Sequence, residues 1–310
     1  MSALICGSVA YDTVMVFPGR FRDHILPDKI HMLNVAFLVP SMKRNFGGCA
    51  GNIAYNLGLL GGQGAPMATV GHDFGPYQRW AGIAGISLAH VKVLEDEFTA
   101  QAFITTDLDD NQITAFHPGA MGRSHVNRVP DDGSVTLGVV APDGRDGMIE
   151  HAAQFAAAGI PWIFDPGQGL PMFDGADLLS FIAKATWVAV NDYEGQLLSE
   201  RTGLTLADIA RKVKALIVTR GAQGSTIYAE GREIVVPVAR PRTVTDPTGC
   251  GDAYRAGLIY GLMHRLDWET TGRIASLMGA LKIAHAGTQN HRFQFDEFRA
   301  EFRAAFGRDL

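Results

Sequence analysis

The sequence has little cysteine, no excess of positive charge and no long apolar run. Its three cysteines, Cys6, Cys49 and Cys250, follow neither a zinc-binding spacing nor a disulfide framework, which is typical of a reducing cytoplasm. A net charge of −5 gives no electrostatic reason to bind nucleic acid or an anionic membrane. No uncharged run reaches the roughly 18 residues needed to span a bilayer. These absences predict a cytoplasmic protein that holds any bound phosphate by local backbone geometry or a metal ion.

What the chain does have is a regular alternation of short apolar segments with helical ones. The strands predicted in its second half are 135–141, 161–164, 186–190 and 215–219. Strands that alternate with helices are typical of an α/β protein, doubly wound around a parallel sheet that is covered on both faces. Two early segments, 13–45 and 98–117, predict strands of a small accessory sheet, one of them at 33–39. We expect a single domain over residues 1–310.

One glycine-rich segment, DPTGCGDAYRAG at 246–257, lies between a predicted strand and a helix predicted to begin at Ala253. Glycines let the backbone turn so that successive N–H groups face one point, and the helix adds its positive dipole end. Such a turn can hold an anion, and Asp252 at its edge could accept the proton of an attacking hydroxyl group. Asp252 could equally be a helix N-cap, a role that aspartate fills well. The segment alone leaves both interpretations open.

A second glycine-rich segment, FGGCAGNIA at 46–54, also leads into a predicted helix. Gly47 and Gly48 would let a flat polar substrate lie against the backbone, while the amide of Asn52 offers both a donor and an acceptor. Asp12 follows a predicted strand and could accept hydrogen bonds from two adjacent sugar hydroxyl groups. Each of these signals is weak when taken alone.

Together, the two segments resemble the signatures of the PfkB (ribokinase-like) family of carbohydrate and nucleoside kinases. The signatures are GGCAGNIA at 47–54 and DPTGCGD at 246–252, and shorter family motifs match GHDFG at 71–75, NDYE at 191–194 and VTRG at 218–221. The resemblance covers about residues 4–290, with the motifs in the family's order. It implies a ribokinase-like three-layer α/β/α fold, in which 13–45 and 98–117 form a small β-sheet lid that closes over the sugar.

The resemblance also implies a reaction, the transfer of the γ-phosphoryl group of ATP to a hydroxyl group. Asp252 would be the base that takes the proton of this hydroxyl group. The backbone N–H groups of Gly249, Cys250 and Gly251 would stabilise the charge on the phosphoryl group in transfer. The Cys250 side chain is then interpreted as a small side chain that fits at the anion site, not as a redox-active thiol.

Binding roles are implied for both substrates. The sugar hydroxyl groups would contact Asp12, Gly47, Gly48 and Asn52. The residues implied at the ATP site are Asn191, Glu194, Thr219, Gly221 and Gly224.

Two cations are implied as well. Mg²⁺ would be held by Asn191 and Glu194 largely through water, as a hard cation with a stable hydration shell prefers. Many family members also bind a potassium ion beside the anion site. Here its ligands would be Asp246 and the carbonyl oxygen of Thr248.

The acceptor could be a nucleoside or a free sugar. Ribokinases carry a lysine in the pattern GGKGAN, where this chain has GGCAGN at 47–52. The segments LNVAFLVPSMKRNFGG (33–48), FHPGAM (116–121) and AGTQNH (286–291) resemble those of bacterial and archaeal adenosine or nucleoside kinases. Phe37 and Phe116 would then contact the base, although they could also be the lid's own small core.

The leading hypothesis is therefore a purine-salvage kinase that phosphorylates the 5′-hydroxyl group of a nucleoside, with adenosine as the first candidate (adenosine + ATP → AMP + ADP). The second is a ribokinase or fructokinase, and the third a non-catalytic sugar- or nucleotide-binding regulator. Asp252 argues against the third, because a binding protein needs no base beside an anion site. The GxSxG, HExxH and GxxxxGK[ST] motifs of other chemistries are missing. A monomer and a homodimer paired through the lid edge at 33–39 both fit the sequence.

Overall fold

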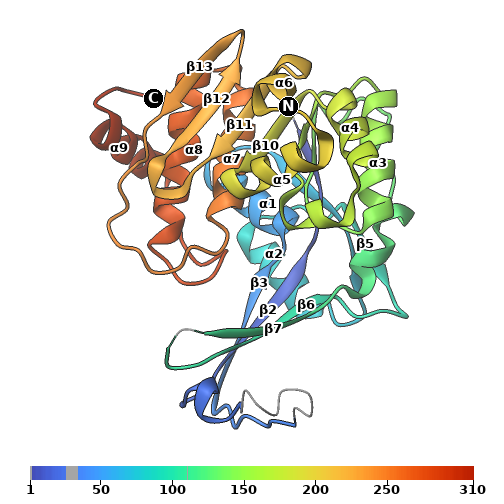
Figure 1. The fold of residues 1–310 in the computed structure, drawn as a ribbon, viewed down its shortest axis with the longest axis vertical. Helices are drawn as coiled ribbons and strands as arrows, with labels where there is room; N and C mark the ends of the chain where they lie inside the picture. The colour runs from blue at the N-terminus through green and yellow to red at the C-terminus, as the bar shows by residue number, and fades with distance from the viewer. Residues whose placement is uncertain (1, 26–33, 110) are drawn as a thin grey trace.

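The computed structural model describes residues 2–25, 34–109 and 111–310, and this part of the chain contains two β-sheets. The larger sheet has the strand order β13-β12-β11-β10-β9-β8-β1-β4-β5 (Figure 1). Its strands are β1 (Ala3–Cys6), β4 (Gly64–Gly71), β5 (His90–Leu94), β8 (Leu137–Val140), β9 (Trp162–Phe164), β10 (Trp187–Asn191), β11 (Ala215–Thr219), β12 (Ser225–Ala229) and β13 (Arg232–Val236). All pairings are parallel except those of β12 with β11 and β13, which confirms a mainly parallel sheet.

Helices cover both faces of this sheet, because successive strand residues point to opposite sides. Ile5 belongs to one buried hydrophobic cluster and its neighbour Leu4 to another. The helices of the first cluster are α1 (Cys49–Leu59), α2 (Gly75–Ala84), α7 (Cys250–Met263) and α8 (Trp268–Ile283). Those of the second are α3 (Arg145–Ala157), α4 (Gly175–Lys184), α5 (Asp192–Thr202) and α6 (Leu206–Lys212). The predicted three-layer α/β/α fold is thereby confirmed.

The remaining helices are short or peripheral. Helix α9 (Phe295–Phe306) packs against α8 through a third hydrophobic cluster. The 3-10 helices are η1 (Phe21–Asp23), η3 (Gly119–Val126), η4 (Gly167–Met172) and η5 (Gly221–Gln223). Within the described ranges, no helix has the length and apolar character that crossing a membrane requires.

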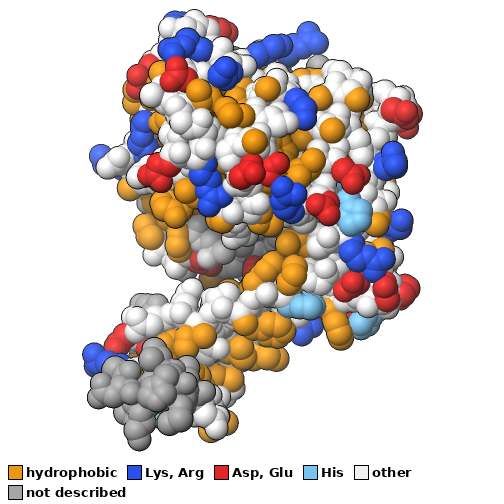
Figure 2. Space-filling view, turned by 45° about the vertical axis from the view of Figure 1, so that its right-hand side comes forward, with side chains coloured by type: hydrophobic (Ala, Val, Ile, Leu, Met, Phe, Trp, Pro, Cys, Tyr) orange, Lys and Arg blue, Asp and Glu red, His pale blue; other side chains and the backbone are white. Residues whose placement is uncertain are grey.

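The smaller sheet projects from the body with the order β3-β2-β6-β7 (Figure 1). Its strands are β2 (Ala10–Val16), β3 (Ser41–Gly47), β6 (Ala100–Thr106) and β7 (Gln112–His117). We call this sheet the lid. In the space-filling view hydrophobic side chains gather on its surface, next to the hollow that separates it from the body (Figure 2).

The prediction of a strand at 33–39 was wrong for the residues that can be checked. Leu33 lies outside the described residues, and 34–39 are not in a strand; β3 begins only at Ser41. The apolar pattern has another cause, because the ring of Phe37 packs against those of Phe17 and Phe21, with centroids 4.8 and 5.0 Å apart. The described edge strands of the lid are β3 and β7, and pairing between two lids stays a prediction.

Candidate active site

Helix α7 places the carboxylate of Asp252 in its first turn. The helix begins at Cys250, and its N-cap is Gly249, whose φ of 79° favours glycine. A Cβ atom there would also lie only 2.9 Å from the Thr288 side chain. Asp252 makes no capping hydrogen bond, and its Oδ2 accepts one from Nδ2 of Asn52 at 2.8 Å. The alternative role of Asp252 as a helix N-cap is therefore wrong.

Free backbone donors surround the start of this helix. Among the described residues, the N–H groups of Gly249, Gly251 and Asp252 have no hydrogen-bond acceptor, whereas the Cys250 N–H donates to the Pro247 carbonyl oxygen at 3.2 Å. A Cβ atom added to Gly251 would meet no described heavy atom within 4 Å, so open space lies beside it. Unpaired N–H groups at the positive end of a helix dipole can bind an anion.

A buried chain of hydrogen bonds fixes which way the Asn52 amide points. The indole N–H of Trp80 can only donate, and it donates to Oε1 of Gln289 at 2.8 Å. The Gln289 NH₂ group therefore donates to Oδ1 of Asn52 at 2.9 Å and to the Tyr77 hydroxyl at 2.8 Å. Only the NH₂ group of Asn52 is then left to face Asp252. The sequence predicted that Asn52 contacts the sugar. The structure adds that Asn52 donates a hydrogen bond to the Asp252 carboxylate.

The environment of Asp252 raises its pKa to about 7. Burial is the main cause, because a low dielectric disfavours the carboxylate. The hydrogen bond from Asn52 and the charge of Arg255 oppose this shift, whereas the charges of Asp165 and Asp12 add to it. A carboxyl group with a pKa near neutrality is well placed to act as a general base.

A buried ion pair lies next to this base, and sequence reasoning missed it. Arg255, one turn beyond Asp252, donates to Oδ1 of Asp165 at 2.9 Å, and both side chains are under a tenth exposed. The same guanidinium lies 4.0 Å from Oε2 of Glu194. The arginine stands within the DAYRAG segment, but no pattern in the sequence identified Asp165 as its partner.

The predicted sugar-binding residues lie where the lid meets the body. A Cβ atom on Gly47 would come within 2.4 Å of Oδ2 of Asp12, so a larger residue here would displace the Asp12 carboxylate. Gly48 has a φ of 86°, and its Cβ atom would meet the Ser8 carbonyl oxygen at 2.6 Å. Burial, together with the charge of Asp246, raises the pKa of Asp12 to about 6. Asp12 is thus close to the anion-binding end of the site.

The two residues predicted to contact the nucleobase have different surroundings in the lid. Asp12 pairs with Ala102 on β6, and Ala102 pairs with Phe116 on β7, so Phe116 shares the lid face of Asp12. Its side chain is 51% exposed and is available to a ligand on that face. Phe37, by contrast, packs in the aromatic cluster with Phe17. That packing favours a role for Phe37 in the lid's own core.

The predicted ATP residues meet at the carboxyl ends of two neighbouring strands. Asn191 on β10 pairs with Thr219 on β11. Gly221 and Gly224 close the turn after β11, where the Gly224 N–H donates to the Gly221 carbonyl oxygen at 3.1 Å.

Asn191 and Glu194 form a capping box at the start of α5. The Asn191 backbone N–H donates to Oε2 of Glu194 at 2.8 Å, and the Glu194 N–H donates to Oδ1 of Asn191 at 2.7 Å. In the described part of the chain, no three His, Cys, Asp or Glu side chains are placed to hold a metal ion together. The Glu194 carboxylate keeps free lone pairs, which fits contact with Mg²⁺ through water and not a direct metal cluster.

The comparison with known sequences decides the family. The family model of the pfkB carbohydrate kinases matches residues 9–293. This chain belongs to that family. Membership confirms the predicted class of enzyme, an ATP-using phosphotransferase that acts on a hydroxyl group, and the predicted ribokinase-like fold.

Several relatives of this kinase are named nucleoside kinases. One from Methanocaldococcus jannaschii is 30% identical over 266 residues, which cover 85% of this chain and 87% of the relative. The solved structure of a Burkholderia thailandensis nucleoside kinase in complex with inosine is 52% identical, with a TM-score of 0.91 and coverage of 99% of this chain and 100% of that one. Its complex with ADP-inosine is 55% identical, with a TM-score of 0.88 and coverage of 99% and 97%.

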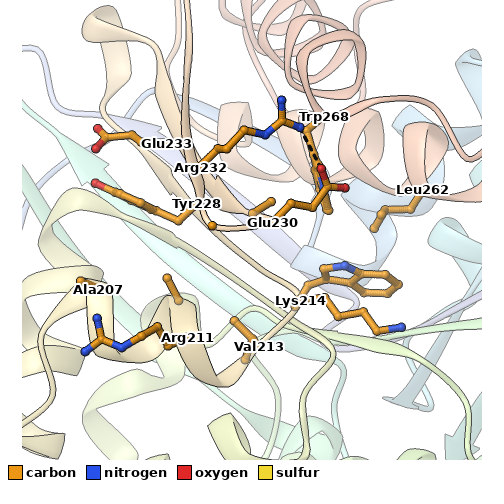
Figure 3. A pocket seen from close by; sticks show the side chains of 14 residues that line it. Ala207, Arg211, Val213, Lys214, Tyr228, Glu230, Arg232, Glu233, Leu262 and Trp268 are labelled. Atoms are coloured by element: carbon orange, nitrogen blue, oxygen red, sulfur yellow. Dashed lines mark hydrogen bonds and ion pairs between the residues drawn. The ribbon is translucent and has the colours of Figure 1, made fainter.

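A separate pocket of about 830 Å³ lies away from the kinase site (Figure 3). Trp187 and Lys214 line it at the amino ends of β10 and β11, together with Trp268 at the start of α8. Glu230 and Arg232, which pair at 2.8 Å in the β12–β13 hairpin, form another wall. The predicted site residues lie at the carboxyl ends of the parallel strands, so this pocket is not part of their site.

Proposed function

We propose that this kinase transfers the γ-phosphoryl group of ATP to the 5′-hydroxyl group of a nucleoside, with adenosine as the predicted acceptor. The observation that carries the proposal is the half-buried carboxylate of Asp252, which lies beside N–H groups at the start of α7 that have no acceptor among the described residues. The relatives named nucleoside kinases support the class of acceptor. The Burkholderia relative was solved with inosine, which makes inosine the direct competitor of adenosine in any test.

Each part of the proposed site has its own role in phosphoryl transfer. Asp252 accepts the proton of the attacking hydroxyl group, which makes its oxygen a better nucleophile. The N–H groups of Gly249 and Gly251 donate to the oxygens of the phosphoryl group as its charge redistributes. Mg²⁺, held through water by Asn191 and Glu194, would supply further neutralising charge on the phosphates.

The lid supplies the acceptor side of the proposed site. The Asp12 carboxylate accepts hydrogen bonds from the ribose hydroxyl groups. The lack of a side chain at Gly47 leaves room for this carboxylate, and the lack of one at Gly48 lets the backbone near Ser8 pack closely against it. The nucleobase would lie against the lid face that carries Asp12 and Phe116. An aromatic ring on that face suits a flat heterocycle better than it suits a free sugar.

The test is an ADP-release assay with Mg-ATP and a panel of adenosine, inosine, guanosine, cytidine, ribose and fructose. We expect turnover with nucleosides and none with free sugars. Phe116→Ala is expected to raise the KM for the nucleoside about 5-fold to 10-fold, as loss of one aromatic contact does. Phe103→Ala is the matched control, because Phe103 is similarly exposed on the opposite lid face. Turnover with free sugars alone, or equal KM changes in both variants, would contradict the proposal.

The pH dependence of kcat is a further prediction. Since the pKa of Asp252 is raised to about 7, the carboxylate form needed for catalysis is lost as the pH falls through this value. We expect kcat to fall roughly tenfold per pH unit below the pKa and to level off above it. Saturating acceptor isolates this effect, because titration of Asp12, with a pKa of about 6, acts on acceptor binding. A kcat that stays flat between pH 5 and about 8 would rule out Asp252 as the titrating base.

A further inference from the structure

A lysine side chain contacts Asp246, one of the two residues that the family resemblance implies as potassium ligands. Lys282 belongs to the last turn of α8, and its side chain is fully buried. Its Nζ donates to the carbonyl oxygen of Asp246 at 2.6 Å and to that of His285 at 3.2 Å. The Oδ2 atom of the Asp246 carboxylate lies 3.8 Å from the same nitrogen.

These oxygen ligands are of the kind that a monovalent cation would need. An ammonium group carries the same single positive charge as K⁺ and binds the same carbonyl and carboxylate oxygens. Two cations within one such set of oxygens would repel each other strongly in a buried environment. Asp246, the side chain predicted to hold potassium, is therefore already neutralised by the chain itself. The residues do not fit a bound potassium ion.

The contacts of Lys282 also connect it to the anion site. Asp246 opens the loop that leads through Pro247 and Thr248 to α7. Its Oδ1 accepts a hydrogen bond from the Thr248 N–H at 2.9 Å, and its Oδ2 accepts one from the Gly287 N–H at 2.8 Å. By fixing the Asp246 carbonyl group, Lys282 fixes the start of this loop. The loop ends at Gly249, whose N–H has no acceptor within the described part of the chain.

We propose that the Lys282 ammonium group is a built-in monovalent cation, which holds the anion-binding loop in place and makes the kinase independent of potassium. Lys282 is thus a positioning residue and does not itself touch the reacting atoms. The effect on turnover rests on the proposed function, whereas the effect of potassium on thermal stability does not.

The first experiment uses the wild-type chain. Its Tm, and its kcat with the best acceptor of the panel, are compared in KCl, NaCl and tetramethylammonium chloride at equal ionic strength. We expect the same Tm and the same kcat in all three salts. A Tm that rises in KCl, or a kcat that rises about tenfold in it, would overturn the proposal. If no acceptor is turned over, the proposed function fails, and the Tm comparison still decides the role of Lys282.

The second experiment removes the charge in two ways. Lys282→Met fills the space without a charge, and we expect kcat to fall roughly 10-fold to 100-fold in every salt, the usual loss for a hydrogen bond to a charged group. Lys282→Ala opens space among the same oxygens, so KCl or ammonium chloride should restore part of kcat and raise the Tm of this variant only. The control is Lys184→Met, whose exposed ammonium group donates to Ser180 on α4. Wild-type kcat and Tm in Lys282→Met would overturn the proposal; if that variant fails to fold, the wild-type salt comparison decides.

Discussion

Replacing Asp252 with asparagine is expected to lower kcat by about 10²-fold to 10⁴-fold, the usual contribution of a positioned general base. Asparagine has the same size, and its carbonyl oxygen can still accept the hydrogen bond that Asn52 donates to Asp252 at 2.8 Å. It cannot take a proton from a hydroxyl group. The KM values for ATP and acceptor should therefore change little, and the loss should lie in kcat. Steady-state kinetics with each substrate varied in turn measures both parameters.

The pH profile and a control variant sharpen this test. In Asp252→Asn the loss of kcat below a pH of about 7 should disappear, since the group that titrates is gone. Asp267→Asn is the control, because Asp267 caps α8 by accepting from the Thr270 N–H, a role that asparagine fills equally well. An Asp252→Asn variant with kcat within about threefold of wild type would show that another group is the base.

Replacing Arg255 with methionine is expected to lower the free energy of unfolding by about 3–5 kcal/mol. The side chains of Arg255 and Asp165 are only 6% and 7% exposed, with 2.9 Å between donor and acceptor atoms. Removing the guanidinium group leaves Asp165 buried without its partner and removes the positive charge that lies 4.0 Å from Glu194. A buried carboxylate without a partner costs far more than one in water. Urea unfolding followed by circular dichroism measures the change.

The matched control for this prediction is Arg211→Met. Arg211 also pairs with a carboxylate, that of Asp208, but its side chain is 72% exposed, so solvent screens the pair. We expect its free energy of unfolding to stay close to that of wild type. Adding Asp165→Leu to Arg255→Met should recover part of the loss, because no buried charge is then left alone. Equal losses in the two arginine variants would mean that burial of the pair at Arg255 has no special effect.

The sequence by itself determined the class of fold and most of the reactive groups. The apolar segments predicted the strands β8, β9, β10 and β11 nearly residue by residue, because buried parallel strands are short, continuous and apolar. It missed β5, whose run HVKVL carries a lysine and exposed positions typical of a sheet edge. It placed a strand at 33–39, where the apolar residues serve side-chain packing instead. The glycine-rich segments identified Asp252 and its anion site because backbone turns of this kind need glycine locally.

Only the tertiary structure decided which groups surround that site. Asn52 and Asp252 are 200 positions apart in sequence, and Gln289 lies 237 positions from Asn52, so no local pattern connects them. The same holds for Lys282 beside Asp246, and for Arg255 beside Asp165. Local propensities act over a few residues, whereas these contacts depend on how the loops at the carboxyl ends of separate strands and the ends of α7 and α8 pack together. The sequence therefore identifies Asp252 as the catalytic base. The packing sets the pKa of Asp252 and places the Lys282 charge beside the loop that leads to it.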